Sequence, residues 1–166
     1  ALAGALLGML DVGDEVVVFE PMYDSYQACI ALAGAVAKPV VLRPGAGPEG
    51  QYGYDPDELR AAFSARTKLV LVNTPHNPTG YLMSRADFEA VNKFAQEKIL
   101  ILFSDEVYRE SEYDPATRLP AACDLGAHAV SLGVTSKTYG LAGLRIGWIA
   151  TKNKKVYQNM AALKDY

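Results

Sequence analysis

Short apolar runs alternate with amphipathic stretches along the 166 residues of the chain. Apolar runs of about four to eight residues, bounded by turn residues, are typical of strands buried on both faces. The stretches between them carry apolar residues at helical spacing, such as Phe88, Val91 and Ala95 behind the capping residue Ser84. The pattern predicts strands at 16–19, 36–42, 69–72, 99–103, 129–132 and 146–150, and helices at about 1–10, 24–33, from Asp55, from Ser84, and at 152–166.

This alternation of strands and helices predicts an α/β fold, a three-layer α/β/α sandwich with a mainly parallel sheet. Pro39 has no N–H group to donate, so strand 36–42 is expected at an edge of the sheet. Strand 146–150 follows strand 129–132 too closely for a crossover helix, and is expected to run antiparallel or to join the sheet after a sharp turn. The stretch 44–53 is rich in Pro and Gly and predicts a loop without an element of its own.

Composition narrows the function classes. Half of the residues are hydrophobic and the formal net charge is −3, without a basic stripe, so we expect no nucleic-acid partner. The longest apolar runs are far too short to span a membrane, so no membrane partner is expected. Cys29 and Cys123 stand alone, without the spacing of a metal site or of a disulfide framework. We therefore expect no metal site, and reduced thiols in a cytoplasmic protein.

Polar and aromatic side chains follow the ends of four predicted strands: Tyr23, Asn77, Asp105 and Lys137. Because parallel strands end at one edge of a sheet, we expect these side chains around one cleft. A lysine there can bind an anion, or its neutral amine can attack a carbonyl to form a Schiff base. The alternative is a solvated surface lysine, since most lysines are surface charges.

The segment around this lysine reads Ser-Lys-Thr-Tyr-Gly-Leu-Ala-Gly-Leu-Arg-Ile-Gly-Trp, from Ser136 to Trp148. It resembles the lysine motif of the class I and II pyridoxal-phosphate-dependent aminotransferases, which have fold type I. The resemblance implies an aspartate aminotransferase-like large domain with pyridoxal 5′-phosphate as its cofactor. It implies that Lys137 is catalytic and holds the cofactor as an internal aldimine, and that Arg145 binds the cofactor's phosphate.

One position departs from the family pattern. The family usually has Ser or Gly three residues before the lysine, where this chain has Val134. A hydroxyl contact to the phosphate from this position must therefore be absent, or be replaced by Thr135 or Ser136. We include Ser136 among the expected cofactor-binding residues.

Two further motifs extend the resemblance. Ser104-Asp105-Glu106-Val107-Tyr108 looks like the family's Asp-Glu-x-Tyr motif, which implies that Asp105 holds a proton on the cofactor's ring nitrogen by a charge-assisted hydrogen bond. Pro-His-Asn-Pro-Thr-Gly contains the family's Asn-Pro-Thr-Gly, which implies that Asn77 and Tyr108 donate hydrogen bonds to the cofactor's phenolic oxygen. Glu106 is expected to be structural.

Two tyrosines and a histidine, Tyr23, Tyr26 and His76, also lie in or near these motifs. Tyr23, after Glu-Pro, matches the family's aromatic residue that stacks on the cofactor ring, with ordinary packing as the alternative. Tyr26 is expected in the core or at the rim of the site. His76 is expected to be a neutral loop residue.

The resemblance also implies the organisation and activity of the protein. Family members are about twice as long or more, so residues 1–166 are expected to be a single cofactor-binding large domain, a fragment without the family's N-terminal segment and C-terminal small domain. The implied activity is transfer of an amino group between an amino acid and a 2-oxo acid, in a homodimer. The same residues would also suit a lyase or decarboxylase of this fold, or an aminotransferase-like sensor module of a regulator.

Overall fold

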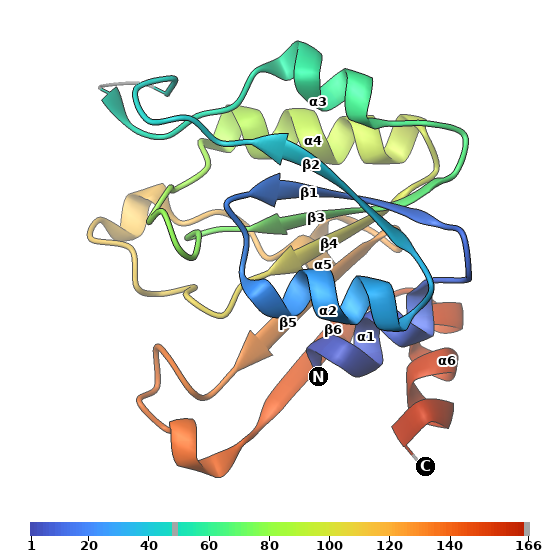
Figure 1. The fold of residues 1–166 in the computed structure, drawn as a ribbon. Coiled ribbons are helices and arrows are strands. Elements are labelled where there is room, and N and C mark those ends of the chain that lie inside the picture. The colour runs from blue at the N-terminus through green and yellow to red at the C-terminus, as the bar shows by residue number, and fades with distance from the viewer. Residues whose placement is uncertain (48–49, 165–166) are drawn as a thin grey trace.

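Six strands form one sheet in the computed structural model, which describes residues 1–47 and 50–164. The strand order is β2-β1-β3-β4-β5-β6, and all neighbours are parallel except β5 and β6 (Figure 1). The antiparallel pairing of the last strand and the edge position of the strand with Pro39 are both confirmed. The strands are β1 (Glu15–Glu20), β2 (Val36–Val41), β3 (Thr67–Asn73), β4 (Ile101–Asp105), β5 (Ala129–Val134) and β6 (Gly147–Thr151).

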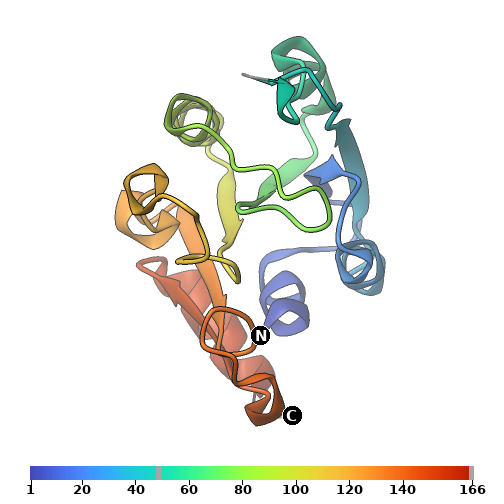
Figure 2. The same cartoon turned by 90° about the vertical axis from the view of Figure 1, so that its left-hand side faces the viewer.

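Helices cover both faces of the sheet, as the sequence predicts. α1, α2 and α6 lie on one face, and α3, α4 and α5 lie on the other (Figures 1 and 2). The helices are α1 (Leu2–Met9), α2 (Asp24–Leu32), α3 (Pro56–Ala62), α4 (Arg85–Glu97), α5 (Ala122–Leu125) and α6 (Lys154–Lys164), with short 3₁₀ turns η2 (Pro115–Thr117) and η3 (Ala142–Leu144).

Alternate residues of each strand enter two separate cores. Val17 and Val70 pack with Phe88 of α4 on one face of the sheet. Val16 and Leu69, one residue earlier in each strand, pack with the helices of the other face. Each fully buried side chain of this kind stabilises the fold by roughly 1.5–3 kcal/mol. The near-continuous apolar runs of the sequence follow from this burial on both sides.

Two helices begin where the sequence places their capping residues. The Asp55 side chain accepts a hydrogen bond from the Asp57 N–H at 2.8 Å, ahead of Pro56 at the first turn of α3. The Ser84 hydroxyl accepts one from the Asp87 N–H at 3.0 Å at the start of α4. Both bonds satisfy backbone donors that the helix itself leaves unpaired.

Several boundaries differ from the sequence prediction. The expected strand 99–103 is wrong at its start, because β4 begins only at Ile101. The loop expected at 44–53 holds an isolated bridge between Arg43 and Gly53, and its residues 48–49 lie outside the described residues. Residues 165–166 of the expected last helix also lie outside them. The short elements η2 and α5 have too few residues for a periodic pattern and were not predicted.

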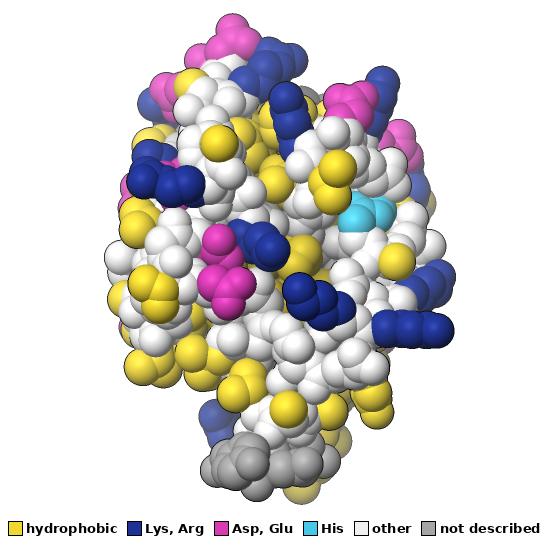
Figure 3. Space-filling model, turned by 90° about the vertical axis from the view of Figure 1, so that its right-hand side faces the viewer, with side chains coloured by type: hydrophobic (Ala, Val, Ile, Leu, Met, Phe, Trp, Pro, Cys, Tyr) yellow, Lys and Arg dark blue, Asp and Glu magenta, His cyan; other side chains and the backbone are white. Residues whose placement is uncertain are grey.

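The two ends of the sheet differ in character. At the end where the parallel strands begin, Lys and Arg side chains are interspersed with Asp and Glu (Figure 3). The opposite end, which faces the viewer in Figure 2, carries the polar residues that follow β1, β3, β4 and β5. Among residues 1–47 and 50–164, no helix combines the length and the apolar character needed to cross a membrane.

Ile99 explains why β4 starts late. The Leu100 N–H donates to the Ala95 carbonyl at 2.8 Å, and this hydrogen bond caps the C-terminal end of α4. Ile99 lies within that turn with φ 58° and is 92% exposed. This left-handed conformation is unfavourable for a β-branched residue and normally belongs to glycine.

We expect Ile99→Gly to stabilise the protein by about 0.5–1 kcal/mol, since relief of left-handed strain exceeds the added entropy of the unfolded chain. Urea unfolding at neutral pH measures the change. Ile99→Ala is the matched control; it keeps a Cβ atom and should gain less. A glycine variant less stable than the wild type would contradict this reading of the turn.

Candidate functional site

A cavity of about 530 Å³ opens at the carboxyl end of the sheet, on the face that α1 and α2 cover. Its volume lies within the usual range of small-molecule sites, about 300–1,000 Å³. All seven residues that the sequence nominates line this one cavity: Tyr23, Asn77, Asp105, Tyr108, Ser136, Lys137 and Arg145.

The register of the sheet explains why these residues meet. Asn73 at the end of β3 pairs with Asp105 at the end of β4. Counting back by two along each strand reaches Leu71 and Phe103, which pack in the core beneath α1 and α2. Side chains of alternate residues share a face, so Asn73 and Asp105 both face α2. On the next strand Val134 also lines the cavity.

Asn73 connects the ends of two strands, a role that the sequence analysis missed. Its side-chain amide donates to the Asp105 carbonyl at 3.0 Å, and its side-chain oxygen accepts from the Asn77 N–H at 2.8 Å. Asn73 is buried, and these bonds fix the Asn77 loop beside β4. The sequence signal that could have identified Asn73 is its position: it is a polar residue at the end of an apolar run, just before the Asn-Pro motif.

The Asp105 carboxyl group is buried, with 3% of the residue exposed. One oxygen, Oδ2, accepts a hydrogen bond from the Tyr26 hydroxyl at 2.5 Å, and Oδ1 accepts one from the Val107 N–H at 3.2 Å. Burial raises the pKa of Asp105 to about 6, while both hydrogen bonds act in the opposite direction. Among the described residues it forms no ion pair, so its charge can receive a cationic partner from a ligand.

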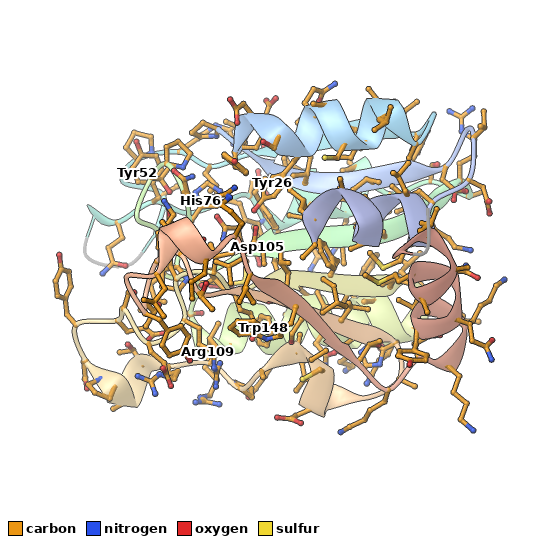
Figure 4. All side chains as sticks on the ribbon, turned by 90° about the horizontal axis from the view of Figure 1, so that it is seen from below. Tyr26, Tyr52, His76, Asp105, Arg109 and Trp148 are labelled. Carbon is orange, nitrogen blue, oxygen red and sulfur yellow. The ribbon has the colours of Figure 1, made fainter. Side chains whose placement is uncertain are left out.

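Tyr26 was expected in the core or at the rim, and it lies in the core with its hydroxyl at the site. Figure 4 shows Tyr26 of α2 close to Asp105 at the end of β4. Tyr23, one turn earlier, is 42% exposed, and its ring stands perpendicular to the Tyr26 ring with centroids 5.6 Å apart. The Tyr23 ring therefore presents an aromatic surface to the cavity.

Lys137 is exposed and sits on a loop that hydrogen bonds hold in place. Its Nζ atom lies 5.6 Å from the centroid of the Tyr108 ring. The Thr138 hydroxyl donates to the Arg109 carbonyl at 2.7 Å, and this bond ties the lysine loop to the segment that follows β4. These contacts keep the amine near the groups contributed by β4.

The two hydroxyls beside Lys137 have different surroundings. Thr135 Oγ1 lies 3.3 Å from the carbonyl oxygens of both Leu141 and Ile146 and donates to them, which links the two ends of the lysine loop. Ser136 instead lines the cavity. Of the two candidates for the missing hydroxyl at position 134, the geometry favours Ser136.

Arg145 provides the cationic end of the cavity. It is exposed, has a left-handed backbone with φ 53°, and directs Nη1 to the Ala142 carbonyl at a long 3.4 Å. A guanidinium group with most of its donors facing solvent can bind an anionic group bidentately. In the described part of the chain, no group of three His, Cys, Asp or Glu side chains is arranged to hold a metal ion.

Glu106 and His76 belong to the motifs but do not line the cavity. Glu106 points to the opposite face, where Oε1 accepts hydrogen bonds from the Ala122 N–H and the Ser131 hydroxyl, both at 2.8 Å. His76 is buried in its own loop and hydrogen-bonds through Nδ1 to Thr79 Oγ1 at 2.8 Å. Burial lowers the pKa of His76 to about 4, so it is neutral at physiological pH.

The buried Asp105 predicts a pH dependence of stability. A carboxyl group whose pKa rises on folding stabilises the folded state below its unfolded value near 4, and this contribution is lost as the pH rises through about 6. From pH 4 to 7 the wild type should lose on the order of 2–3 kcal/mol of unfolding free energy from this group. Urea unfolding across that pH range measures it.

The matched variants separate Asp105 from other carboxylates. Asp105→Asn should flatten the decline in stability with pH. Asp124→Asn removes an exposed carboxylate near Lys152 and should retain the wild-type slope. Equal slopes in the wild type and Asp105→Asn would contradict the assigned burial effect.

Comparison with known proteins places this geometry in a family. The family described as "Aminotransferase class I and II" matches residues 1–165. The probable N-succinyldiaminopimelate aminotransferase DapC of Mycobacterium tuberculosis is 34% identical over 171 residues, which cover 100% of this chain and 41% of that protein. Human kynurenine–oxoglutarate transaminase 1 is 34% identical over 157 residues, covering 90% of this chain and 37% of that protein.

Solved structures agree in fold. The N-succinyldiaminopimelate aminotransferase from Mycobacterium tuberculosis superposes with a TM-score of 0.87 at 34% identity, covering 97% of this chain and 42% of that one. A double mutant of Thermus thermophilus aspartate aminotransferase has a TM-score of 0.87 at 30% identity, covering 98% and 41%. The aspartate aminotransferase-like fold is thereby confirmed, and the chain spans about two-fifths of these relatives. By family match, sequence identity and fold, this chain belongs to the class I and II aminotransferases.

Proposed function

We propose that the protein transfers an amino group between an amino acid and a 2-oxo acid with pyridoxal 5′-phosphate as cofactor, and that Lys137 is its catalytic residue. One observation carries the proposal: the Lys137 amine and the buried Asp105 carboxyl group line the same cavity. An amine that can condense with an aldehyde and a carboxylate that can hold a protonated ring nitrogen are two requirements of this cofactor.

The residues of the cavity fit the groups of pyridoxal phosphate. Asp105 would pair with the ring nitrogen, and the exposed Tyr23 ring offers a face for stacking. Asn77 and Tyr108 would donate hydrogen bonds to the phenolic oxygen. Arg145 and Ser136 would hold the phosphate. When bound, the cofactor acts as an electron sink for the substrate carbanion.

Lys137 performs two tasks in this proposal. Its amine would hold the cofactor covalently by condensing with the aldehyde carbon, with loss of water. Once displaced by the amino group of a substrate, the amine would take the proton from the substrate's α-carbon and return it at the cofactor's C4′ carbon, first as base and then as acid. The loop contact from Thr138 to Arg109 keeps the amine in reach for both steps.

We further propose that residues 1–166 are the central part of one cofactor-binding large domain in a cytoplasmic homodimer. The length of the relatives supports the first point, since this chain covers 41% of DapC. Leu141, Leu144 and Ile146, large apolar residues beside the cavity, are each about half exposed, which suits a surface that another subunit or segment covers. The free thiols of Cys29 and Cys123 suit a reducing compartment.

We expect Lys137→Ala to abolish covalent trapping of pyridoxal phosphate by borohydride, because the variant lacks the amine that forms the reducible bond. Mass spectrometry of the reduced full-length protein measures the attached cofactor. Lys152→Ala removes an amine near Asp124, outside the cavity, and should trap as much cofactor as the wild type. Trapping that persists in Lys137→Ala would refute the assignment of this lysine.

The reaction class has its own test. Full-length protein with bound cofactor is incubated with panels of amino acids and 2-oxo acids, and the products are quantified. Exchange of the amino group between the two panels is expected. Release of ammonia or pyruvate without exchange would contradict transamination and would indicate a lyase of the same fold.

A further inference from the structure

The first turn of α2 contributes a second tyrosine to the site, and the proposed function leaves it without a role. Tyr26 follows Tyr23 by three residues, so both side chains lie on one face of the helix. Tyr26 is 1% exposed, and its ring packs in the core between α2 and the sheet. Its hydroxyl ends 2.5 Å from Asp105 Oδ2, across 79 residues of sequence (Figure 4).

A buried carboxylate needs hydrogen-bond donors to stay charged. Removal from water favours the neutral acid, and a neutral Asp105 could not form a charge-assisted pair with a protonated ring nitrogen. The Val107 N–H reaches Oδ1 at 3.2 Å, whereas the Tyr26 hydroxyl reaches Oδ2 at 2.5 Å. The Tyr26 bond is therefore the shorter of the two that favour the ionised form.

The other titratable groups around Asp105 do not take over this task. Glu106, the next residue, is acidic and opposes ionisation of Asp105, although its side chain points to the opposite face. Tyr23, Cys29, Tyr108, Lys137 and Arg145 line the cavity, but no hydrogen bond joins any of these five side chains to Asp105 among the described residues. Leu2 and Ala3 of α1 and its N-cap residue Ala1 also line the cavity, and their side chains are apolar.

Tyr26 is suited to remain a donor. Its burial and the negative charge of Asp105 raise the pKa of the phenol far above its usual range, so the hydroxyl keeps its proton. The same bond orients the carboxyl group by holding one of its two oxygens. A phenylalanine would fill nearly the same volume in the core without supplying the donor.

We propose that Tyr26 is a positioning residue of this site: its hydroxyl keeps the Asp105 carboxylate ionised and oriented for a protonated ring nitrogen. The role of Asp105 toward a cofactor rests on the proposed function. The effect of Tyr26 on Asp105 does not, and it can be measured without any cofactor.

The primary test is a titration of Asp105 in the cofactor-free protein. The carboxyl carbon, labelled with ¹³C and assigned with Asp105→Asn, is followed by NMR from pH 4 to 9. The wild type should titrate near pH 6, and Tyr26→Phe should titrate at least about one unit higher because it lacks the donor. Tyr54→Phe is the matched control; it removes a half-buried hydroxyl 3.5 Å from Asp87 and should titrate like the wild type. An unchanged pKa of Asp105 in Tyr26→Phe would overturn the proposal.

A second measurement needs no folded Tyr26 variant. A hydroxyl proton shared at 2.5 Å with a buried carboxylate should give a proton resonance far downfield of the amides. It should appear in the wild type and in Tyr54→Phe above pH 7, and disappear in Asp105→Asn. Its absence from the wild type would also overturn the proposal.

A final measurement separates this inference from the proposed function. In the full-length enzyme with pyridoxal phosphate, Tyr26→Phe should still attach the cofactor to Lys137, while its affinity falls about tenfold or more and the acid limb of its kcat/KM profile moves to higher pH. Failure of both proteins to attach the cofactor would refute the proposed function and leave the NMR result standing. Attachment with unchanged affinity and an unchanged pH profile would refute the role of Tyr26.

Discussion

The pairing of Asn73 with Asp105 across β3 and β4 is the constraint on which the site depends. A shift of one residue in this register would move one of the two side chains to the face of α4 and α5. The buried runs before them, Leu69 to Val72 and Leu102 to Phe103, make such a shift unfavourable, because it would exchange residues between two filled cores. The packing of the sheet thus fixes the position of the carboxylate on which the proposed chemistry rests.

Asp105 is buried at the end of β4, where its ionised form is destabilised by the loss of water. Burial favours its neutral form, whereas two donors, the Tyr26 hydroxyl and the Val107 N–H, favour its charge. In the absence of a cationic partner this arrangement lowers the stability of the folded protein at neutral pH. A protonated ring nitrogen would supply the missing charge, so binding of the cofactor and stability of the fold are coupled at this residue.

Much of this arrangement could be predicted from the sequence. The apolar runs predict the order of elements, and the positions after the strand ends predict that Tyr23, Asn77, Asp105 and Lys137 meet at one cavity. Tyr108, Ser136 and Arg145 are nominated by the family resemblance instead. The hydrogen bonds of Asn73 and Tyr26 to Asp105 escaped prediction, because they span 32 and 79 residues of sequence. The start of β4 was predicted two residues too early, because the apolar, β-branched side chain of Ile99 favours a strand. In the structure Ile99 lies in a left-handed turn.

If Lys137 and Asp105 act on one molecule of cofactor, a crystal structure of the full-length protein grown with pyridoxal 5′-phosphate should show both contacts. We expect electron density continuous from Lys137 Nζ into the cofactor, with the ring nitrogen within hydrogen-bonding distance of the Asp105 carboxylate. Cofactor density that is attached to another lysine, or a ring nitrogen that faces away from Asp105, would contradict this expectation.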